Sequence, residues 1–143
     1  EEHFLQIRPE WVRDGDYKER SGYIETRRLL DLEERPTAIF AANDLMALGA
    51  LTAIEEANLQ VPQDIAVVGY DDIPLAAKVR PRLTTVAQPK YELGQQAMER
   101  LIWRLSNGDV EKRAETMVLQ PRLVIRESSL AGSIVNEESL QGR

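Results

Sequence analysis

The chain has 143 residues, of which 43% are hydrophobic and 29% are charged, and its formal net charge at pH 7 is −6. This length and composition are typical of a globular domain with a hydrophobic core. The acidic balance argues against nucleic acid as a direct partner of this segment. The sequence has no cysteine and a single histidine, His3, which excludes disulfides and zinc–thiolate sites and leaves little for histidine-based chemistry. No apolar run approaches the roughly 18 residues of a membrane span.

The first thirty residues contain only weak structural signals. Residues 1–5 resemble the tail of a helix whose start is missing, which indicates a piece of a longer polypeptide. Residues 11–13 are typical of a short strand, and Tyr17 follows the Asp-Gly-Asp turn at the carboxyl end of that strand. We expect the next helix to begin at residue 19 or 21 and to end near residue 33.

The clearest pattern is a strand, a helix and a second strand between residues 38 and 72. Residues 38–42 are a short apolar run, as in a parallel strand that is buried on both faces. Asn43 then caps a helix that runs to about Asn58, and residues 64–69 form the next strand. Such a crossover joins parallel strands, and ligands of parallel sheets bind at the carboxyl ends of the strands. We therefore expect Asn43 and Asp71 at one rim of the sheet.

The helix at residues 45–58 carries more leucine than one core face needs. Its core face is formed by small and medium apolar residues, and a second set, Leu45, Leu48 and Leu51, falls on a different side. These leucines are either scattered surface residues, which are common, or part of an interface between subunits or subdomains. We favour the interface.

The second half of the chain predicts four more segments. Residues 73–82 form a proline-bounded loop with at most one helical turn, and residues 83–88 form a strand. Residues 90–107 form the clearest amphipathic helix. Residues 116–126 alternate loosely, and Pro121 marks an edge strand or a break between two strands. We expect residues 127–143 to be a mostly disordered tail.

The polar residues favour binding over catalysis. Asp71 and Asp72 could hold a ligand, or either could cap a turn; a metal or phosphoacceptor site would need Asp14, Asp16 and Asp44 gathered nearby. The sequence contains no phosphate-binding loop, no dinucleotide-binding fingerprint and no nucleophile elbow. Tyr17 either packs against the first helix or stacks on a ring-shaped ligand. We expect no catalytic residue, no metal and no cofactor.

Four segments together resemble the effector domain of the LacI/GalR family of bacterial transcription regulators. They are AIFAANDLMALGA (residues 38–50), VPQDIAVVGYDD (61–72), PRLTTV with Gln88-Pro89 (81–89) and LQPRLVIR (119–126). The segment GDY followed by SGY, at residues 15–23, is similar to the purine-repressor branch of that family.

This resemblance implies an α/β fold of the type I periplasmic-binding-protein-like class, a three-layer sandwich around a parallel sheet, with two subdomains that close on a small effector. Residues 1–126 would be an incomplete, carboxyl-terminal portion of that domain: residues 1–88 and 118–126 in the C-terminal subdomain, and residues 89–117 in the N-terminal subdomain. The family's helix-turn-helix, most of the first subdomain and the opening strand of the second have no counterpart in the sequence. The helix at 90–107 would therefore either dock against a neighbouring copy or be poorly packed.

The resemblance also implies roles for particular residues. Asp71 would accept hydroxyl or N–H groups of a sugar or nucleobase-like effector, with Asn43 beside it and Tyr17 as a stacking wall. The family's homodimer surface would hold Leu45, Leu48 and Leu51, with Leu75 and Val79 from the following loop. Operator DNA would be bound only through the missing domain, in the cytoplasm and without a membrane. The alternative is a periplasmic sugar-binding protein of an ABC transporter, and an acidic-pocket enzyme is a distant third hypothesis.

Overall fold

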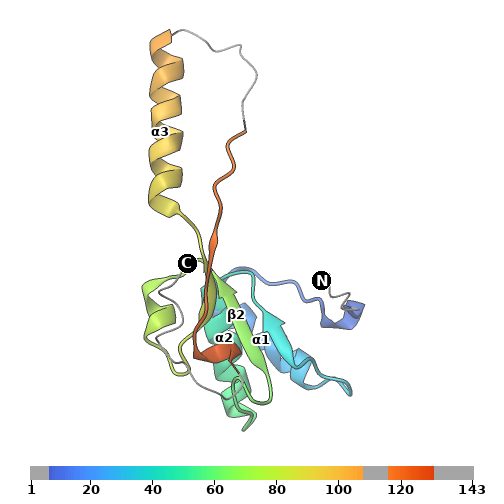
Figure 1. Ribbon diagram of the computed structural model, residues 1–143. Helices are drawn as coiled ribbons and strands as arrows, with labels where there is room; N and C mark the ends of the chain where they lie inside the picture. The colour runs from blue at the N-terminus through green and yellow to red at the C-terminus, as the bar shows by residue number, and fades with distance from the viewer. Residues whose placement is uncertain (1–6, 108–115, 131–143) are drawn as a thin grey trace, which may run out of the picture.

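The computed structural model describes residues 7–107 and 116–130, which form a four-stranded mixed sheet with the order β1-β2-β3-β4 (Figure 1). Strands β1 (Ala38–Phe40), β2 (Ala66–Tyr70) and β3 (Thr84–Ala87) are parallel, and β4 (Arg122–Val124) pairs with β3 in the antiparallel direction. The predicted strand–helix–strand crossover is confirmed. Pro121 directly precedes β4, as expected for the start of an edge strand.

The core lies between the sheet and one face of helix α2 (Asp44–Glu56). Ile39 pairs with Val67, and Gly69 pairs with Thr85, so these residues point to the same face of the sheet. Val67 and Leu83 from the sheet side meet Ile54 of α2, and all three are fully buried. Because α2 supplies mostly alanines to this contact, it packs close to the sheet.

Helix α1 (Glu19–Leu30) crosses α2 with the two backbones in direct contact. A Cβ atom at Gly49 would lie 2.0 Å from the carbonyl oxygen of Glu19, and one at Gly22 would lie 2.1 Å from that of Met46. Only Gly22, Thr26 and Leu29 of α1 are buried, so the helix has a narrow buried face.

The opposite face of the sheet is covered only in part. Phe40, Val68 and Thr84 point to this face, and Phe40 is 66% exposed whereas Thr84 is buried beneath the short 3-10 helix η3 (Glu127–Ser129). Among the described residues, this face therefore has no complete helical layer.

The prediction of a disordered tail from residue 127 is wrong for residues 127–130. Ser128 is fully buried; its hydroxyl donates to the carbonyl of Val67 at 2.6 Å and accepts from the amide of Thr84 at 2.8 Å. Residues 131–143 lie outside the described part of the chain.

The predicted strand at residues 11–13 is also wrong. Pro9–Trp11 is a 3-10 helix, η1, and Val12 is extended (φ −87°, ψ 120°) without pairing to a described strand. The Trp11 indole N–H donates to the carbonyl of Glu34 at 3.0 Å, and the guanidinium of Arg8 lies 5.4 Å from the ring centroid. These contacts hold the segment beside the end of α1 instead of in the sheet.

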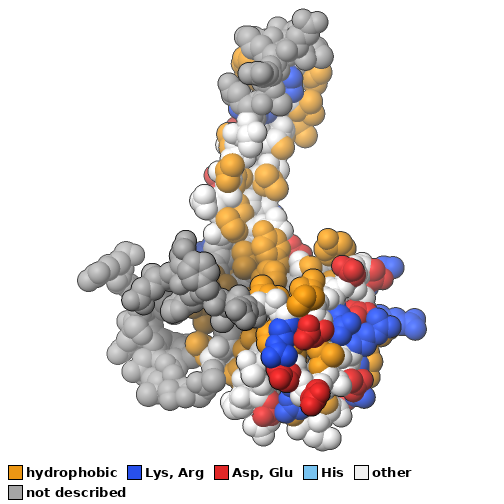
Figure 2. All heavy atoms as spheres, turned by 90° about the vertical axis from the view of Figure 1, so that its right-hand side faces the viewer, with side chains coloured by type: hydrophobic (Ala, Val, Ile, Leu, Met, Phe, Trp, Pro, Cys, Tyr) orange, Lys and Arg blue, Asp and Glu red, His pale blue; other side chains and the backbone are white. Residues whose placement is uncertain are grey.

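Helix α3 (Lys90–Asn107) confirms the predicted amphipathic helix and projects away from the sheet (Figure 1). Its apolar side chains are exposed, and Figure 2 shows hydrophobic side chains along the projecting part of the molecule. Leu101 is 52%, Ile102 55% and Leu105 74% exposed. None of the described helices is long and apolar enough to cross a membrane.

Candidate ligand-binding site at the carboxyl ends of the strands

The three parallel strands end at one edge of the sheet, and each is followed by a polar residue. Asn43 comes shortly after β1, Asp71 directly after β2 and Gln88 directly after β3. Tyr17 joins them because the Asn43 side chain binds its backbone. The predicted residues Tyr17, Asn43 and Asp71 are thus brought to one rim.

Asn43 links the Tyr17 turn to the start of α2. Its Oδ1 accepts the amide N–H of Met46 at 2.9 Å, which is an N-cap bond. Its Nδ2 donates to the carbonyl oxygen of Tyr17, also at 2.9 Å. The predicted capping role is confirmed, and one acceptor position of Oδ1 remains for a further bond.

Tyr17 stands on a tight turn and is largely exposed. Its φ is 63°, in the left-handed region, and it is 65% exposed, so it does not simply pack against α1. Asp16 shapes the turn: its carboxylate accepts the amide of Lys18 at 3.1 Å, and its own amide donates to the Ser21 hydroxyl at 3.1 Å. Hydrogen bonding with Ser21, followed by that with Lys18, lowers the pKa of Asp16. The exposed ring is free to stack on a planar or ring-shaped group.

Asp71 is half-buried and its backbone is strained, with φ at 114°. Its amide donates to the carbonyl of Val86 at 2.9 Å, and the ammonium of Lys90 donates to its carbonyl oxygen. Its Oδ1 accepts from Nε2 of Gln88 at 2.6 Å, whereas no described residue donates to Oδ2. The carboxylate is therefore held by one bond and can accept others from a ligand.

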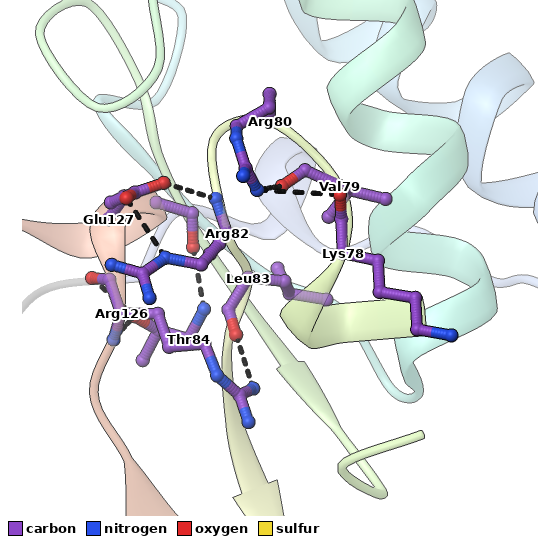
Figure 3. A network of polar contacts seen from close by, with 9 residues as sticks. Lys78, Val79, Arg80, Arg82, Leu83, Thr84, Arg126 and Glu127 are labelled. Carbon is purple, nitrogen blue, oxygen red and sulfur yellow. Dashed lines mark hydrogen bonds and ion pairs between the residues drawn. The ribbon is translucent and has the colours of Figure 1, made fainter. Parts of the chain in front are cut away.

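Asp72 has a different role from Asp71, although the two are adjacent. Its carboxylate forms an ion pair with Arg126 at 2.7 Å, and the side chains of this pair are 25% and 16% exposed. Arg126 also donates to the carbonyl of Leu83, and its backbone bonds the hydroxyl of Thr84 (Figure 3). Asp72 is thus the turn-stabilising member of the pair.

Two residues of this rim were absent from the sequence-based site. Gln88 follows the third parallel strand, so the strand-end rule that selected Asn43 and Asp71 also selects it. Arg126 gave no such signal, because its contact with Asp72 spans 54 residues. Among the described residues, no three histidine or acidic side chains are grouped closely enough to hold a metal ion.

The described residues do not enclose a cavity at the rim. A cavity of about 350 Å³ lies beside β1 and is lined by Tyr17, Phe40 and Met46, but Asn43 and Asp71 do not line it. The described residues therefore present one wall of a site.

Four of the five predicted interface residues line a second hollow. Leu48 and Leu51 of α2 face Leu75 and Val79 of the loop after β2 across a groove of about 420 Å³. Leu48 is only 7% exposed, so it belongs mostly to the core. Leu45 lies outside this groove and is 42% exposed.

Comparison with known proteins gives one consistent set of relatives. The family model of the periplasmic binding protein-like domain matches residues 1–129. The HTH-type transcriptional repressor PurR of Photorhabdus laumondii is 44% identical over 132 residues, which cover 92% of this chain and 38% of that repressor. PurR of Proteus mirabilis is 42% identical over 95% of this chain and 39% of its own length. The chain thus spans about two-fifths of the curated relatives that it matches.

Solved structures agree with these relatives. The lac repressor dimer bound to operator and the anti-inducer ONPF is 43% identical, with a TM-score of 0.73 over 82% of this chain and 40% of that one. A LacI family regulator from Enterococcus faecium with bound ribose is 36% identical, with a TM-score of 0.70 over 80% of this chain and 41% of that one. A complex of the transcriptional regulator CelR with cellobiose is 37% identical, with a TM-score of 0.74 over 80% of this chain and 35% of that one. These matches confirm the predicted fold class and show that the chain holds only part of it.

Proposed function

We propose that the chain is the effector-sensing and dimerising part of a transcriptional regulator. It belongs to the family of periplasmic binding protein-like domains, in the form found in LacI-family transcriptional regulators. In this proposal a sugar or nucleobase-like molecule binds at the rim and controls the binding of operator DNA by another segment of the same polypeptide. Residues 1–88 and 118–126 belong to the C-terminal subdomain and residues 89–117 to the N-terminal one. The protein acts in the cytoplasm and has no catalytic activity.

The observation that carries this proposal is the arrangement of Tyr17, Asn43 and Asp71 at the carboxyl ends of the parallel strands. The exposed ring supplies a stacking surface, and the Asp71 carboxylate has an oxygen free to accept ligand hydroxyl or N–H groups. The chain leaves the sheet toward α3 directly after Gln88 and returns through residues 116–121 into β4. A ligand on this rim would lie between the sheet and the N-terminal subdomain, to which we assign α3.

Such a position allows ligand binding to control a distant site. A ligand that contacts both subdomains favours their closed arrangement. A shift between an open and a closed arrangement is a common form of allostery. The coupling between effector and operator would be about 1–3 kcal/mol, the usual range for such systems.

The groove between α2 and the loop after β2 is our proposed homodimer surface. Leu51, Leu75 and Val79 line it together with Leu48, and Leu45 extends the apolar surface along α2. A symmetric dimer would place the same groove of each subunit against its partner.

The binding proposal is tested in the complete natural polypeptide by calorimetric titration with ribose, cellobiose, guanine and hypoxanthine. We expect either the sugars or the nucleobases to bind. Asp71→Asn should weaken that binding about tenfold or more because a charged acceptor is lost. The matched control is Asp64→Asn, since Asp64 is an exposed aspartate whose side chain accepts a hydrogen bond from the amide of Gln60, away from the rim. Unchanged affinity in Asp71→Asn would contradict the assigned site.

The alternative, a sugar-binding protein of a transporter, is tested by the amino-terminal sequence of the natural polypeptide. We expect a basic helix-turn-helix segment. A cleaved signal peptide would instead support the transporter, and steady consumption of a bound compound would support an enzyme.

A further inference from the structure

Asp44 is a buried carboxylate behind the rim. It is the first residue of α2 and is fully buried. Its Oδ2 accepts the amide N–H of Ile73 at 2.8 Å, and its Oδ1 accepts the hydroxyl of Thr85 at 2.5 Å. The same hydroxyl oxygen accepts the amide N–H of Asp72 at 3.3 Å. One carboxylate therefore fixes, directly or through Thr85, the two amides that follow Asp71.

These two amides belong to a strained turn. Asp71 has φ at 114° and Asp72 has φ at 49°, and both values lie in the left-handed region that residues with a side chain rarely adopt. Such a conformation persists only where surrounding contacts hold it. On the outer side the turn is held by the Asp72–Arg126 ion pair, and on the inner side by the Asp44 carboxylate.

The neighbouring strands leave space for this carboxylate. A Cβ atom at Gly69 would lie 2.3 Å from Oδ1 of Asp44, so only glycine allows the close approach of β2. Burial raises the pKa of Asp44, and the nearby charges of Asp71 and Asp72 raise it further, against the lowering by its two hydrogen bonds. An acid in this place is electrostatically unfavourable, and its bonds to the amide of Ile73 and to the hydroxyl of Thr85 explain what it does there.

We propose that Asp44, with Thr85 as its relay, is a positioning residue for the effector site: it holds residues 71–73 in the conformation that presents the Asp71 carboxylate to the ligand. Asp44 touches no ligand itself. This inference rests on the proposed function for the role of Asp71.

The first test measures hydrogen exchange at the amides of residues 72 and 73 in the complete polypeptide. Thr85→Val keeps the shape of the side chain and removes the relay, so we expect exchange at the amide of residue 72 to become at least tenfold faster. Thr85→Ser keeps the hydroxyl and should restore the slow rate. Asp44→Asn provides an acceptor for only one of the two donors and should give a partial effect at the same amides. Thr37→Val, an exposed threonine just before β1, is the matched control.

The second test measures affinity in the same variants with ribose, cellobiose, guanine and hypoxanthine as probes. We expect Thr85→Val to weaken binding of the accepted probe about tenfold and Thr85→Ser to bind as the parent does, with equal thermal stability of the two variants. Parental exchange rates in Thr85→Val would overturn the inference. So would parental affinity in a variant whose turn exchanges fast. If the parent binds none of the probes, the proposed ligand classes fail, and the exchange rates still decide whether Asp44 holds the turn.

Discussion

At the scale of single residues, the Ser128 hydroxyl closes the core by bonding two strands at once. It is fully buried between the carbonyl of Val67 and the amide of Thr84. Next to it, Arg82 and Glu127 form a two-bond contact: the backbone amide of Arg82 donates at 2.7 Å and its Nε at 2.9 Å (Figure 3). Together these bonds fasten the end of the described chain to β3.

Replacement of Ser128 by alanine should therefore destabilise the fold. The amide of Thr84 would lose its acceptor in a dry environment, and we expect the free energy of unfolding to fall by about 1–3 kcal/mol. Chemical denaturation measures this change. Ser106→Ala, on the exposed surface of α3, should leave stability within about 0.5 kcal/mol of the parent. Equal stability of both variants would contradict the anchoring role of Ser128.

The buried acid Asp44 predicts a particular dependence of stability on pH. Its pKa in the folded state is raised above the ordinary value of 3.8, chiefly by burial. The folded state then binds the proton more tightly than the unfolded state, so the contribution of Asp44 to stability is greatest below pH 3.8 and is lost as the pH rises through the folded-state pKa.

The neutral variant Asp44→Asn lacks this titration. We expect the unfolding free energy of the parent, relative to the variant, to fall as the pH is raised from about 3 to 7. Paired denaturation series at several pH values measure the difference. A difference that rises with pH would show that the hydrogen bonds outweigh burial and that the pKa is lowered.

Sequence patterns placed some site residues correctly and could not place others. Asn43 and Asp71 follow apolar strands, so their position at the rim depends only on local sequence and on the rule for parallel sheets. The burial of Asp44 depends on Gly69 and on a hydroxyl 41 residues away, and no local pattern contains that information. The ligand roles of Tyr17, Asn43 and Asp71 stay predictions.

At the scale of elements, the crossing of α1 and α2 depends on two glycines without side chains. Gly49→Ala would place a methyl group 2.0 Å from the backbone oxygen of Glu19, which neither helix can avoid without moving. We expect a loss of about 1–3 kcal/mol in the free energy of unfolding. Gly94→Ala is the matched control, because nothing lies within 4 Å of that position on α3.

In the control, the alanine should favour the helix by up to about 1 kcal/mol. Thermal unfolding followed by circular dichroism compares the two variants. A stability of Gly49→Ala equal to that of the parent would contradict the close crossing.

The elements that the sequence predicted well have strong local patterns, and the others depend on distant partners. The apolar runs of β1 and β2 and the amphipathic pattern of α3 need no knowledge of the rest of the chain. Residues 11–13 resemble a strand, but a strand also needs a neighbour, and their tryptophan instead bonds Glu34. The tail looked disordered because its composition is polar, whereas the burial of Ser128 satisfies two groups of β2 and β3.

At the scale of the whole molecule, the apolar side of the amphipathic helix α3 has no cover among the described residues. We expect this 143-residue chain on its own to associate with a second copy through α3. Sedimentation analysis over a range of concentrations measures the association. Leu101→Lys with Ile102→Lys should abolish it, whereas Gln96→Lys on the polar side should not.

A wild-type chain that stays monomeric at high concentration would contradict self-association. Strong binding of a hydrophobic dye to that monomer, lost in the double variant, would then show that the apolar side of α3 remains in water.

The position of β4 in the sheet also determines when the domain can be completed. The bond between Ser128 and Val67 spans 61 residues, and that between Thr84 and Ser128 spans 44, with α3 inside the loop that they close. Closing a loop of this length costs entropy before the contacts form, which slows folding. During synthesis, the carbonyl of Val67 in β2 and the amide of Thr84 in β3 lack their hydrogen-bond partner until residue 128 has left the ribosome. Helix α3 lies within this loop, so it is synthesised completely before residue 128 can close the domain.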